Sequence, residues 1–329
     1  MKKVFSGILM IFIWHLSIFS QTILTPGYPT TEIFTDFHLN LDDTSKTTGF
    51  GLNRAYLGYR FLPENNISGS VILNAGVPDD LTTGTVTRRY AYLREASLSW
   101  EKEGLKITFG ITGTRLFNFQ QKFWDKRYIA NSYQSKNGYG HVADLGVVVD
   151  YVISDVLKAD VTLMNGEGYT SIQLDNGIKC SLGFTITPNE KISLRIYGDI
   201  MKSEDLLQPM FVSFIGYKDS KLTIGGEFTY KSNLELIKGH HAWGLSGTGS
   251  LVIFKKTEVF TRFDYSASVN VPDLSRHWHF LMDGSFLITG IQYSPANNIK
   301  FALNYQGTYP YDSEINMSNA IYINALFRY

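Results

Sequence analysis

The chain has 329 residues, with 30 basic and 30 acidic side chains and a formal net charge of 0. This balance gives no electrostatic basis for binding nucleic acid, so we expect no nucleic-acid partner. The single cysteine, Cys180, excludes an intramolecular disulfide framework and a zinc site built from cysteines. Aromatic residues make up 14% of the chain, yet no spanning-length apolar run follows the first twenty residues, which is typical of short strands with one apolar face.

Residues 1–20 have the three parts of a secretory signal peptide. Lys2 and Lys3 form the positive start, an apolar run follows, and Ser20 is a small residue suited to the cleavage position. An uncleaved membrane anchor is the alternative, but no polar stop-transfer segment follows the apolar run. We therefore expect an exported protein, with residues 21–32 as a periplasmic lead-in to the folded part.

From residue 33 to residue 329, apolar and polar residues alternate with a period of two. In Ile178–Thr187, for example, the apolar residues share one face, and Lys, Ser, Gly and Thr share the other. About sixteen such segments follow one another, the first being Ile33–Leu41 and the tenth Met210–Tyr217. Most have about 9–12 residues, the length that crosses a bilayer at a tilt.

The connections between these segments alternate in length. Those after even-numbered strands are short, such as 101–104 and 255–256, and those after odd-numbered strands are longer, such as 115–140 and 266–280. This predicts an all-β fold, a transmembrane antiparallel β-barrel of about 16 strands with short periplasmic turns and long external loops. The apolar face must then meet lipid, because a charge there costs about 2–4 kcal/mol at mid-bilayer. We expect the outer membrane of a Gram-negative bacterium, with contacts to its lipid and lipopolysaccharide.

The stretch from residue 115 to residue 140 is too long and too aromatic for a plain hairpin loop. It is also locally basic, with one acid, Asp125, against five basic residues: Arg115, Lys122, Lys126, Arg127 and Lys136. Folded into the barrel, these charges would attract anions. Resting on lipopolysaccharide phosphates or on a neighbouring subunit is the alternative.

Several segments resemble the phosphate-selective porin O/P family, in a form similar to porin-like members from Bacteroidetes-type bacteria. The resemblance implies a sixteen-stranded diffusion channel, often a homotrimer, whose third long loop folds inward, and it favours the inward interpretation of residues 115–140. The predicted lumen mixes acids with bases instead of presenting a basic ladder, so the family name assigns no substrate. The segments that carry the resemblance are LNRAYLGYRF (52–61), YLREASLSW (92–100), LKITFGITGT (105–114), FWDKRYI (123–129), MNGEGY (164–169), VFTRFDY (259–265) and the final strand IYINALFRY.

We predict that the solute path combines the central stretch with charges on the barrel wall. Arg262 and Asp264 share one face of a strand, as do Arg195 and Asp199, and such pairs form either a substrate track or structural ion pairs. We favour ion pairs. The residues predicted at the constriction or along the path are Arg115, Lys122, Asp125, Lys126, Arg127, Arg54, Arg195, Arg262 and Asp264.

No sequence motif indicates catalysis or a cofactor. His240 and His241 are adjacent and point apart on an extended chain, His277 and His279 lack a third ligand, and calcium at Glu167 lacks a ligand set. We predict no enzymatic activity, no metal and no cofactor. The predicted function is a porin for passive diffusion of small hydrophilic solutes or ions, with a mild anion preference. The alternative is a structural or adhesive barrel without channel activity.

Overall fold

The computed structural model of the protein describes residues 26–42, 48–76, 89–174, 176–203, 206–269 and 283–329. The predicted signal peptide at residues 1–20 lies outside the described residues and stays a prediction. Residues 21–25 of the expected lead-in lie outside them too, as do His277 and His279.

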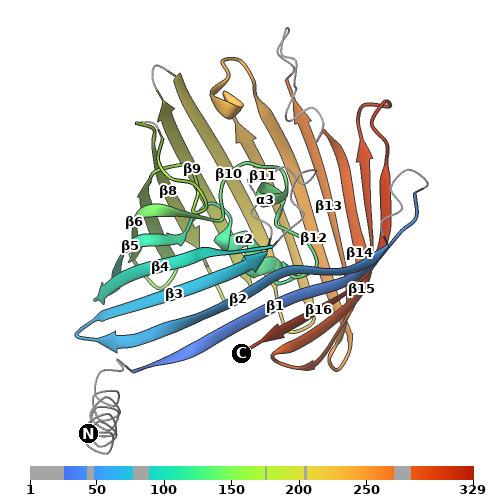
Figure 1. Cartoon of the computed structure of the whole chain (residues 1–329), viewed down its shortest axis with the longest axis horizontal. Coiled ribbons are helices and arrows are strands. Elements are labelled where there is room, and N and C mark those ends of the chain that lie inside the picture. The colour runs from blue at the N-terminus through green and yellow to red at the C-terminus, as the bar shows by residue number, and fades with distance from the viewer. Residues whose placement is uncertain (1–25, 43–47, 77–88, 175, 204–205, 270–282) are drawn as a thin grey trace, which may run out of the picture.

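Sixteen antiparallel strands close into one barrel, as the alternation predicts (Figure 1). Every strand pairs with its neighbour in the chain, and the first strand closes the ring on the last, with Ile33 opposite Phe327 and Asn40 opposite Ala320. Closure pairs both edges of every strand, which a lipid environment requires. The strands are β1 (Gly27–Asn40), β2 (Gly49–Glu64), β3 (Ile67–Gly76), β4 (Tyr90–Lys102), β5 (Leu105–Gly113), β6 (Ala143–Val152), β7 (Leu157–Met164), β8 (Ile178–Ile186), β9 (Ile192–Ser203), β10 (Leu206–Lys218), β11 (Leu222–Lys231), β12 (Ala242–Phe254), β13 (Thr257–Ser268), β14 (Gly284–Ala296), β15 (Ile299–Pro310) and β16 (Ser318–Arg328).

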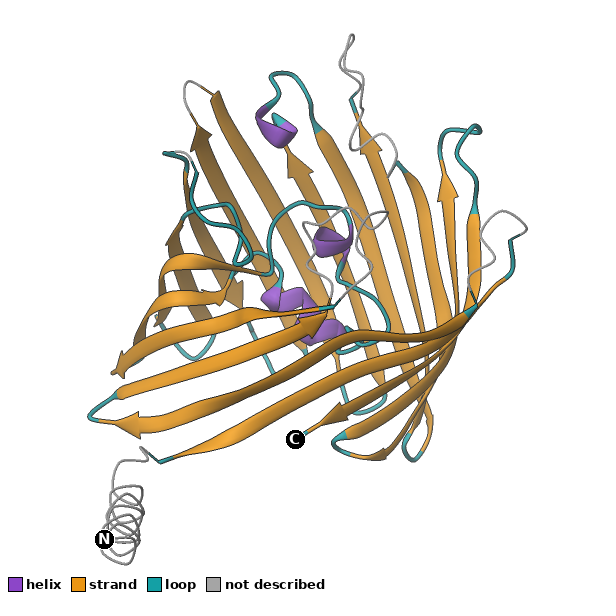
Figure 2. Cartoon of the chain, in the orientation of Figure 1, coloured by secondary structure: helices purple, strands orange, loops and turns teal. Residues whose placement is uncertain are grey.

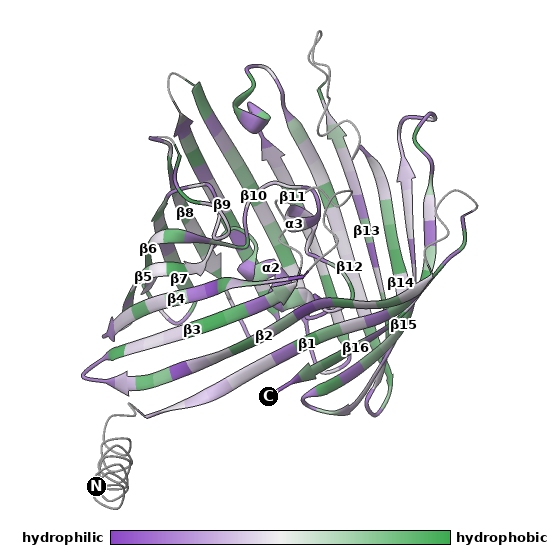
Figure 3. Ribbon diagram, in the orientation of Figure 1, coloured by the Kyte–Doolittle hydropathy of each residue, from purple (hydrophilic) through white to green (hydrophobic). Residues whose placement is uncertain are grey.

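The two faces of the barrel divide as the period of two predicts, because exposed and buried residues alternate along strands such as β8 and β10. Figure 3 shows hydrophilic and hydrophobic residues mixed along the strands. Outward side chains include Leu98, Phe109 and Ile215, which are 64%, 65% and 60% exposed on the isolated chain. Inward neighbours are polar, and Thr162 and Ser181 form a hydrogen bond of 2.6 Å across β7 and β8. Because burying apolar surface away from water is favourable, the outer face suits lipid and the inner face suits water.

Aromatic side chains occupy both ends of the outer face. Trp100, Tyr151 and Tyr293 lie near the short turns, and Tyr230 and Trp243 lie near the long connections, all partly exposed. Such rings suit the two interfaces of a bilayer. None of the helices in the described part of the chain is long and apolar enough to cross a membrane.

The short turns have the backbone that tight hairpins need. Asn65 and Asn66 have φ of 51° and 66°, and Glu103 and Gly104 have φ of 51° and 81°. Two consecutive positive φ angles define the turn whose twist matches the flanking strands. The even-to-odd connections are therefore tight, as predicted.

Two strands, β1 and β10, begin at least four residues before their predicted starts. β1 begins at Gly27, and Gly27 already lies opposite Phe61, so the second half of the expected lead-in is strand. β10 begins at Leu206 instead of Met210, because Leu206 and Leu207 pair with Ser203 and Lys202 of β9. The expected long connection between β9 and β10 is therefore short, since backbone pairing extends the hairpin.

The connection between β5 and β6 lies inside the barrel, where Figures 1 and 2 show its two short helices, α2 (Asn118–Trp124) and α3 (Tyr133–Lys136). We call residues 114–142 the lumen loop. A third short helix, η1 (Leu234–Leu236), follows β11. The buried apolar side chains form two clusters, and both contain residues of the lumen loop.

Candidate constriction in the barrel lumen

One apolar cluster joins the middle of the lumen loop to the strands on both sides of the β1–β16 seam. Trp124, Tyr128 and Ile129 are 7%, 2% and 6% exposed. They pack on inward side chains that interrupt the polar face, such as Phe34, which the period of two leaves as an exception. The apolar exceptions on the lumen face therefore mark where the loop rests. The wall members of this cluster are Phe34, Tyr56, Ile72, Phe260, Phe286, Ile288, Ala302 and Leu326.

A second apolar cluster joins the two ends of the lumen loop to the opposite wall. Leu116 and Phe117 from the first end, with Tyr133 and Tyr139 from the second, are at most 1% exposed. They pack on inward residues that include Tyr197, Met210 and Val212. The loop therefore crosses the lumen between two walls, and the inward interpretation of residues 115–140 agrees with this geometry.

Glycines on the wall make room for aromatic rings of the loop. A side chain on Gly216 of β10 would overlap the ring of Phe123, which instead packs edge-on against Phe214 with centroids 5.0 Å apart. A side chain on Gly244 of β12 would overlap the hydroxyl of Tyr133. The inward glycines at these positions therefore leave the space that the two aromatic side chains of the loop occupy.

Two wall arginines hold the backbone of the lumen loop. Arg195 of β9 pairs with both carboxylate oxygens of Asp160, at 2.7 and 3.0 Å, and donates from Nη2 to the carbonyl of Arg115 at 2.8 Å. Arg262 of β13 pairs with both oxygens of Asp264, at 2.8 and 2.6 Å, and donates from Nη1 to the carbonyl of Asn131 at 2.6 Å. We call Arg195 and Arg262 the anchor arginines. They fix the loop at two points because a guanidinium can bind a carboxylate and a carbonyl together.

A polar network completes the attachment on the β13–β14 side. The Tyr128 hydroxyl donates to Gln292 Oε1 at 2.7 Å, and Gln292 Nε2 donates to Glu258 Oε1 at 2.7 Å. Glu258 also pairs with Lys126, at 3.0 Å. Burial lowers the pKa of Lys126 below 10.5, an effect that Glu258 opposes, and burial raises the pKa of Tyr128.

The structure sorts the predicted path residues into distinct environments. Arg195, Arg262 and Asp264 are 3%, 1% and 2% exposed, and Arg195 lines a cavity in the lumen. Their place on the solute path stays a prediction, whereas Arg262 and Asp264 form an ion pair of 2.6 Å. The partner expected for Arg195 differs, because Arg195 binds Asp160 and Asp199 binds Lys179 at 3.1 Å.

Two more predicted residues, Arg54 and Lys126, are buried, at 7% and 4% exposed. Arg115, Lys122 and Arg127 line cavities in the lumen. Asp125 is exposed, and its carboxylate pairs with Lys300 at 2.6 Å.

Two cavities lie on the short-turn side of the lumen loop. One, of about 340 Å³ beside β1–β4, is bordered by Arg60, Arg94, Lys122 and Arg127 among other residues, and we call it the basic cavity. The other, of about 440 Å³ beside β5–β9, includes Arg115, Lys122, Asp150, Lys158 and Asp160 in its lining. Lys122 on α2 borders both.

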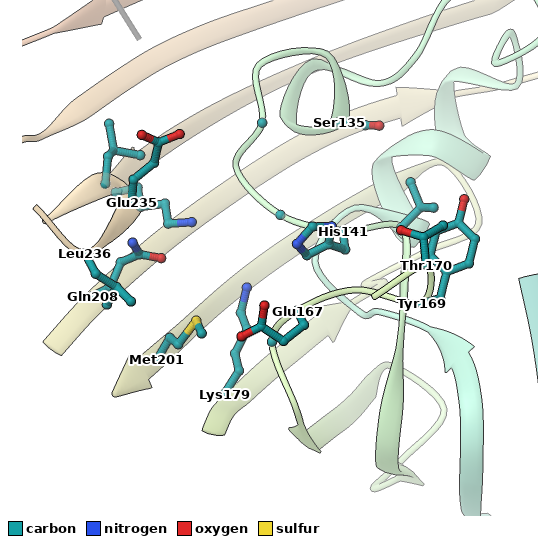
Figure 4. A pocket seen from close by; sticks show the side chains of 16 residues that line it. Ser135, His141, Glu167, Tyr169, Thr170, Lys179, Met201, Gln208, Glu235 and Leu236 are labelled. Carbon is teal, nitrogen blue, oxygen red and sulfur yellow. The ribbon is translucent and has the colours of Figure 1, made fainter. Parts of the chain in front are cut away.

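A third cavity, of about 400 Å³, lies on the long-loop side, and we call it the loop-side cavity. Figure 4 shows His141 of the lumen loop, Lys179 and Gln208 of the wall, and Glu167 and Tyr169 of the β7–β8 connection around it. Arg94 lines the basic cavity and contacts two residues that line the loop-side cavity, Tyr169 and Val142. Its guanidinium lies 5.3 Å from the centre of the Tyr169 ring and donates to the Val142 carbonyl at 3.3 Å.

Arg94 is not among the residues predicted for the solute path, because strict alternation along the strand turns Arg94 outward when its neighbour Glu95 faces the lumen. The register shifts between Ile72 and Leu73 of β3, which lie opposite Glu95 and Leu93, so Arg94 is the extra residue of a bulge. A bulge re-aims a side chain. An arginine that faces lipid costs free energy, so the outward position that alternation gives Arg94 was the signal that the register shifts in this strand.

No set of three His, Cys, Asp or Glu side chains within the described ranges could hold a metal ion. His241 accepts or donates a hydrogen bond of 2.8 Å with Ser232, and His240 is buried. Glu167 lines the loop-side cavity without a calcium ligand set among the described residues.

No family model and no curated protein matches the chain. Membership in the phosphate-selective porin O/P family therefore stays a prediction. Solved structures do resemble it. OmpF of Salmonella typhi in complex with daunomycin has 8% identity and a TM-score of 0.69, over 92% of this chain and 97% of that chain.

An anion-selective porin from Comamonas acidovorans has 9% identity and a TM-score of 0.65, over 92% and 99% of the two chains. A loop-deletion variant of OmpT, an outer membrane protein of Vibrio cholerae, has 13% identity and a TM-score of 0.65 over the same shares. At these identities the likeness shows the fold alone. This chain thus has the closed 16-strand architecture of outer-membrane porins.

Proposed function

We propose that the protein is a porin of the Gram-negative outer membrane that lets small hydrophilic solutes or ions diffuse passively, without catalysis. One observation carries this proposal. A loop crosses a closed barrel, is held at both walls, and leaves cavities of about 340 and 400 Å³ on its two sides. Such a loop narrows a lumen without filling it. The apolar outer face and the solved structures of similar fold support the membrane location.

We propose that the solute path runs along β1–β4, from the basic cavity past Arg94 to the loop-side cavity. Five basic residues border the basic cavity against two acids, Glu32 and Glu95, and the five are Arg60, Arg94, Lys122, Arg127 and Arg328. Excess positive charge in a narrow, low-dielectric passage favours anions. This supports a mild anion preference, without a preference for phosphate.

The test is ion selectivity of the purified protein in planar bilayers. Wild type should give discrete current steps, with a reversal potential in asymmetric salt that indicates anion preference. Removing a positive charge about 4 Å from the path raises the energy of an anion by about 1 kcal/mol in water and lowers that of a cation by the same amount. Arg94→Gln or Arg127→Gln should therefore lower the anion-to-cation permeability ratio by roughly thirty-fold. Lys221→Gln, at an exposed turn, is the matched control.

Absence of current steps in wild type would refute the porin and favour the structural or adhesive barrel. Current steps with unchanged ion selectivity in Arg94→Gln and Arg127→Gln would support the porin and refute the proposed solute path.

We also propose a homotrimer. The strands from β5 to β8 have only 9, 10, 8 and 9 residues, whereas those from β12 to β15 have 12 or 13. A tilted strand needs about 9–11 residues to span lipid, so the strands from β5 to β8 are at the lower limit of this length. We propose that this part of the barrel wall contacts neighbouring subunits in place of lipid. A monomeric mass by light scattering in mild detergent, corrected for bound detergent, would refute the trimer.

A further inference from the structure

The loop-side cavity contains a buried ammonium group with few partners. Lys231, at the end of β11, is 7% exposed and lines the cavity. Its Nζ donates to the Tyr139 carbonyl at 3.0 Å, and no carboxylate of the described residues lies within the 4.0 Å of an ion pair. An ammonium has three donors, so a second and a third remain for other acceptors. A buried charge with so little compensation is costly, unless an anion joins it.

A second ammonium reaches the same place. Lys179 of β8 pairs with Asp199 at 3.1 Å, and its Nζ would lie 3.5 Å from a side chain built on Gly140. Lys231 binds the carbonyl of Tyr139, the residue before Gly140. The lumen loop therefore brings both lysines, from β8 and β11, to adjacent backbone positions at the edge of one cavity.

The rest of the cavity determines what kind of anion fits. Glu167 and Glu235 also line it, and they disfavour a doubly charged ligand beside two lysines, of which Lys179 already pairs with Asp199. The amide oxygen of Gln208 and the Tyr169 hydroxyl, for which the described residues supply no hydrogen-bond partner, can bind a hydroxylated body. Figure 4 shows both residues at the cavity. The volume of about 400 Å³ is within the range of small-molecule sites, at its lower end.

We propose that the loop-side cavity binds small polyhydroxy carboxylates, with the carboxylate held between Lys231 and Lys179 and the hydroxyl groups bound by the polar lining. This inference rests on the proposed function, because it gives the channel a site that concentrates one class of solute at its outer mouth. The site differs from the basic cavity, which lies on the other side of the lumen loop.

Calorimetric titration of the purified full chain in detergent tests the site. Gluconate and sorbitol form a matched pair, because they share a polyol body and differ by the carboxylate. At constant ionic strength, wild type should bind gluconate at least tenfold more tightly than sorbitol and more tightly than inorganic phosphate. Lys231→Met and Lys179→Gln should each weaken gluconate binding about ten- to hundred-fold, the value of hydrogen bonds to a charged group.

Lys221→Met, which removes an exposed ammonium from the short turn after β10, should keep wild-type affinity. Circular dichroism establishes that each variant is folded, and the half-buried Lys179 provides a second test should Lys231→Met not fold. Equal binding of gluconate and sorbitol, tighter binding of phosphate, or full affinity in folded Lys231→Met or Lys179→Gln would overturn the proposal.

Calorimetry needs no open channel, so the two proposals fail separately. Gluconate binding without current steps would refute the porin and support the site. Current steps without gluconate binding would support the porin and overturn the site.

Discussion

The anchor arginines and the arginines of the basic cavity share a chemistry and differ in their surroundings. Arg262 is 1% exposed, binds Asp264 through two hydrogen bonds and holds a loop carbonyl. Arg60 borders a cavity and pairs with Glu95 at 3.4 Å, with 40% of its side chain exposed. Both lie on the lumen face. The difference teaches that an inward arginine can hold the lumen loop or border a cavity, and that burial of the ion pair separates the two.

The largest expected effect comes from breaking an anchor. Arg262→Met should lower the free energy of unfolding by about 3–5 kcal/mol, because Asp264 stays buried without its partner. Urea unfolding in detergent micelles measures the loss. Arg60→Met, the matched control, should change stability by at most about 1 kcal/mol, since its pair is partly exposed.

A double variant isolates the charge. Arg262→Met with Asp264→Leu should recover part of the lost stability, because no uncompensated charge remains. Similar losses for Arg262→Met and Arg60→Met would contradict the division into two kinds of arginine.

A smaller effect is expected where the loop is held by one neutral hydrogen bond. Tyr128→Phe removes the donor to Gln292 Oε1, at 2.7 Å, and should cost about 1–2 kcal/mol of unfolding free energy. Tyr293→Phe, on the outer face of the same strand as Gln292 and 50% exposed, should cost little. If both variants unfold at the same urea concentration, the Tyr128 bond does not stabilise the loop.

The smallest effect is a pH dependence at Lys126. Burial places its folded-state pKa below 10.5, so between the two pKa values the unfolded chain binds more protons. The contribution of Lys126 to stability therefore rises as pH increases from the folded pKa toward 10.5. Unfolding free energies measured from pH 7 upward should rise less steeply for Lys126→Met than for wild type or Lys221→Met. Identical slopes would show that Lys126 is not desolvated.

The fold was predictable because the two faces of each strand meet different environments, lipid on the outside and water on the inside. Lipid outside and water inside impose a period of two, so strands such as Ile178–Ile186 and their faces can be assigned residue by residue. The alternation of connection lengths gave the orientation and drew attention to residues 115–140. Even the apolar exception at Phe34 was visible, although its reason, contact with the lumen loop, was not.

The sequence by itself therefore determined a closed barrel of sixteen strands, its outer and inner faces, and an unusual basic connection after the fifth strand. Tertiary structure alone decided which charges hold that connection and which face the cavities. The hydrogen bond from Arg262 to Asn131 joins residues 131 positions apart, and the one from Tyr128 to Gln292 spans 164. A period of two reports local geometry only, so neither these contacts nor the bulge that turns Arg94 inward can be read from it.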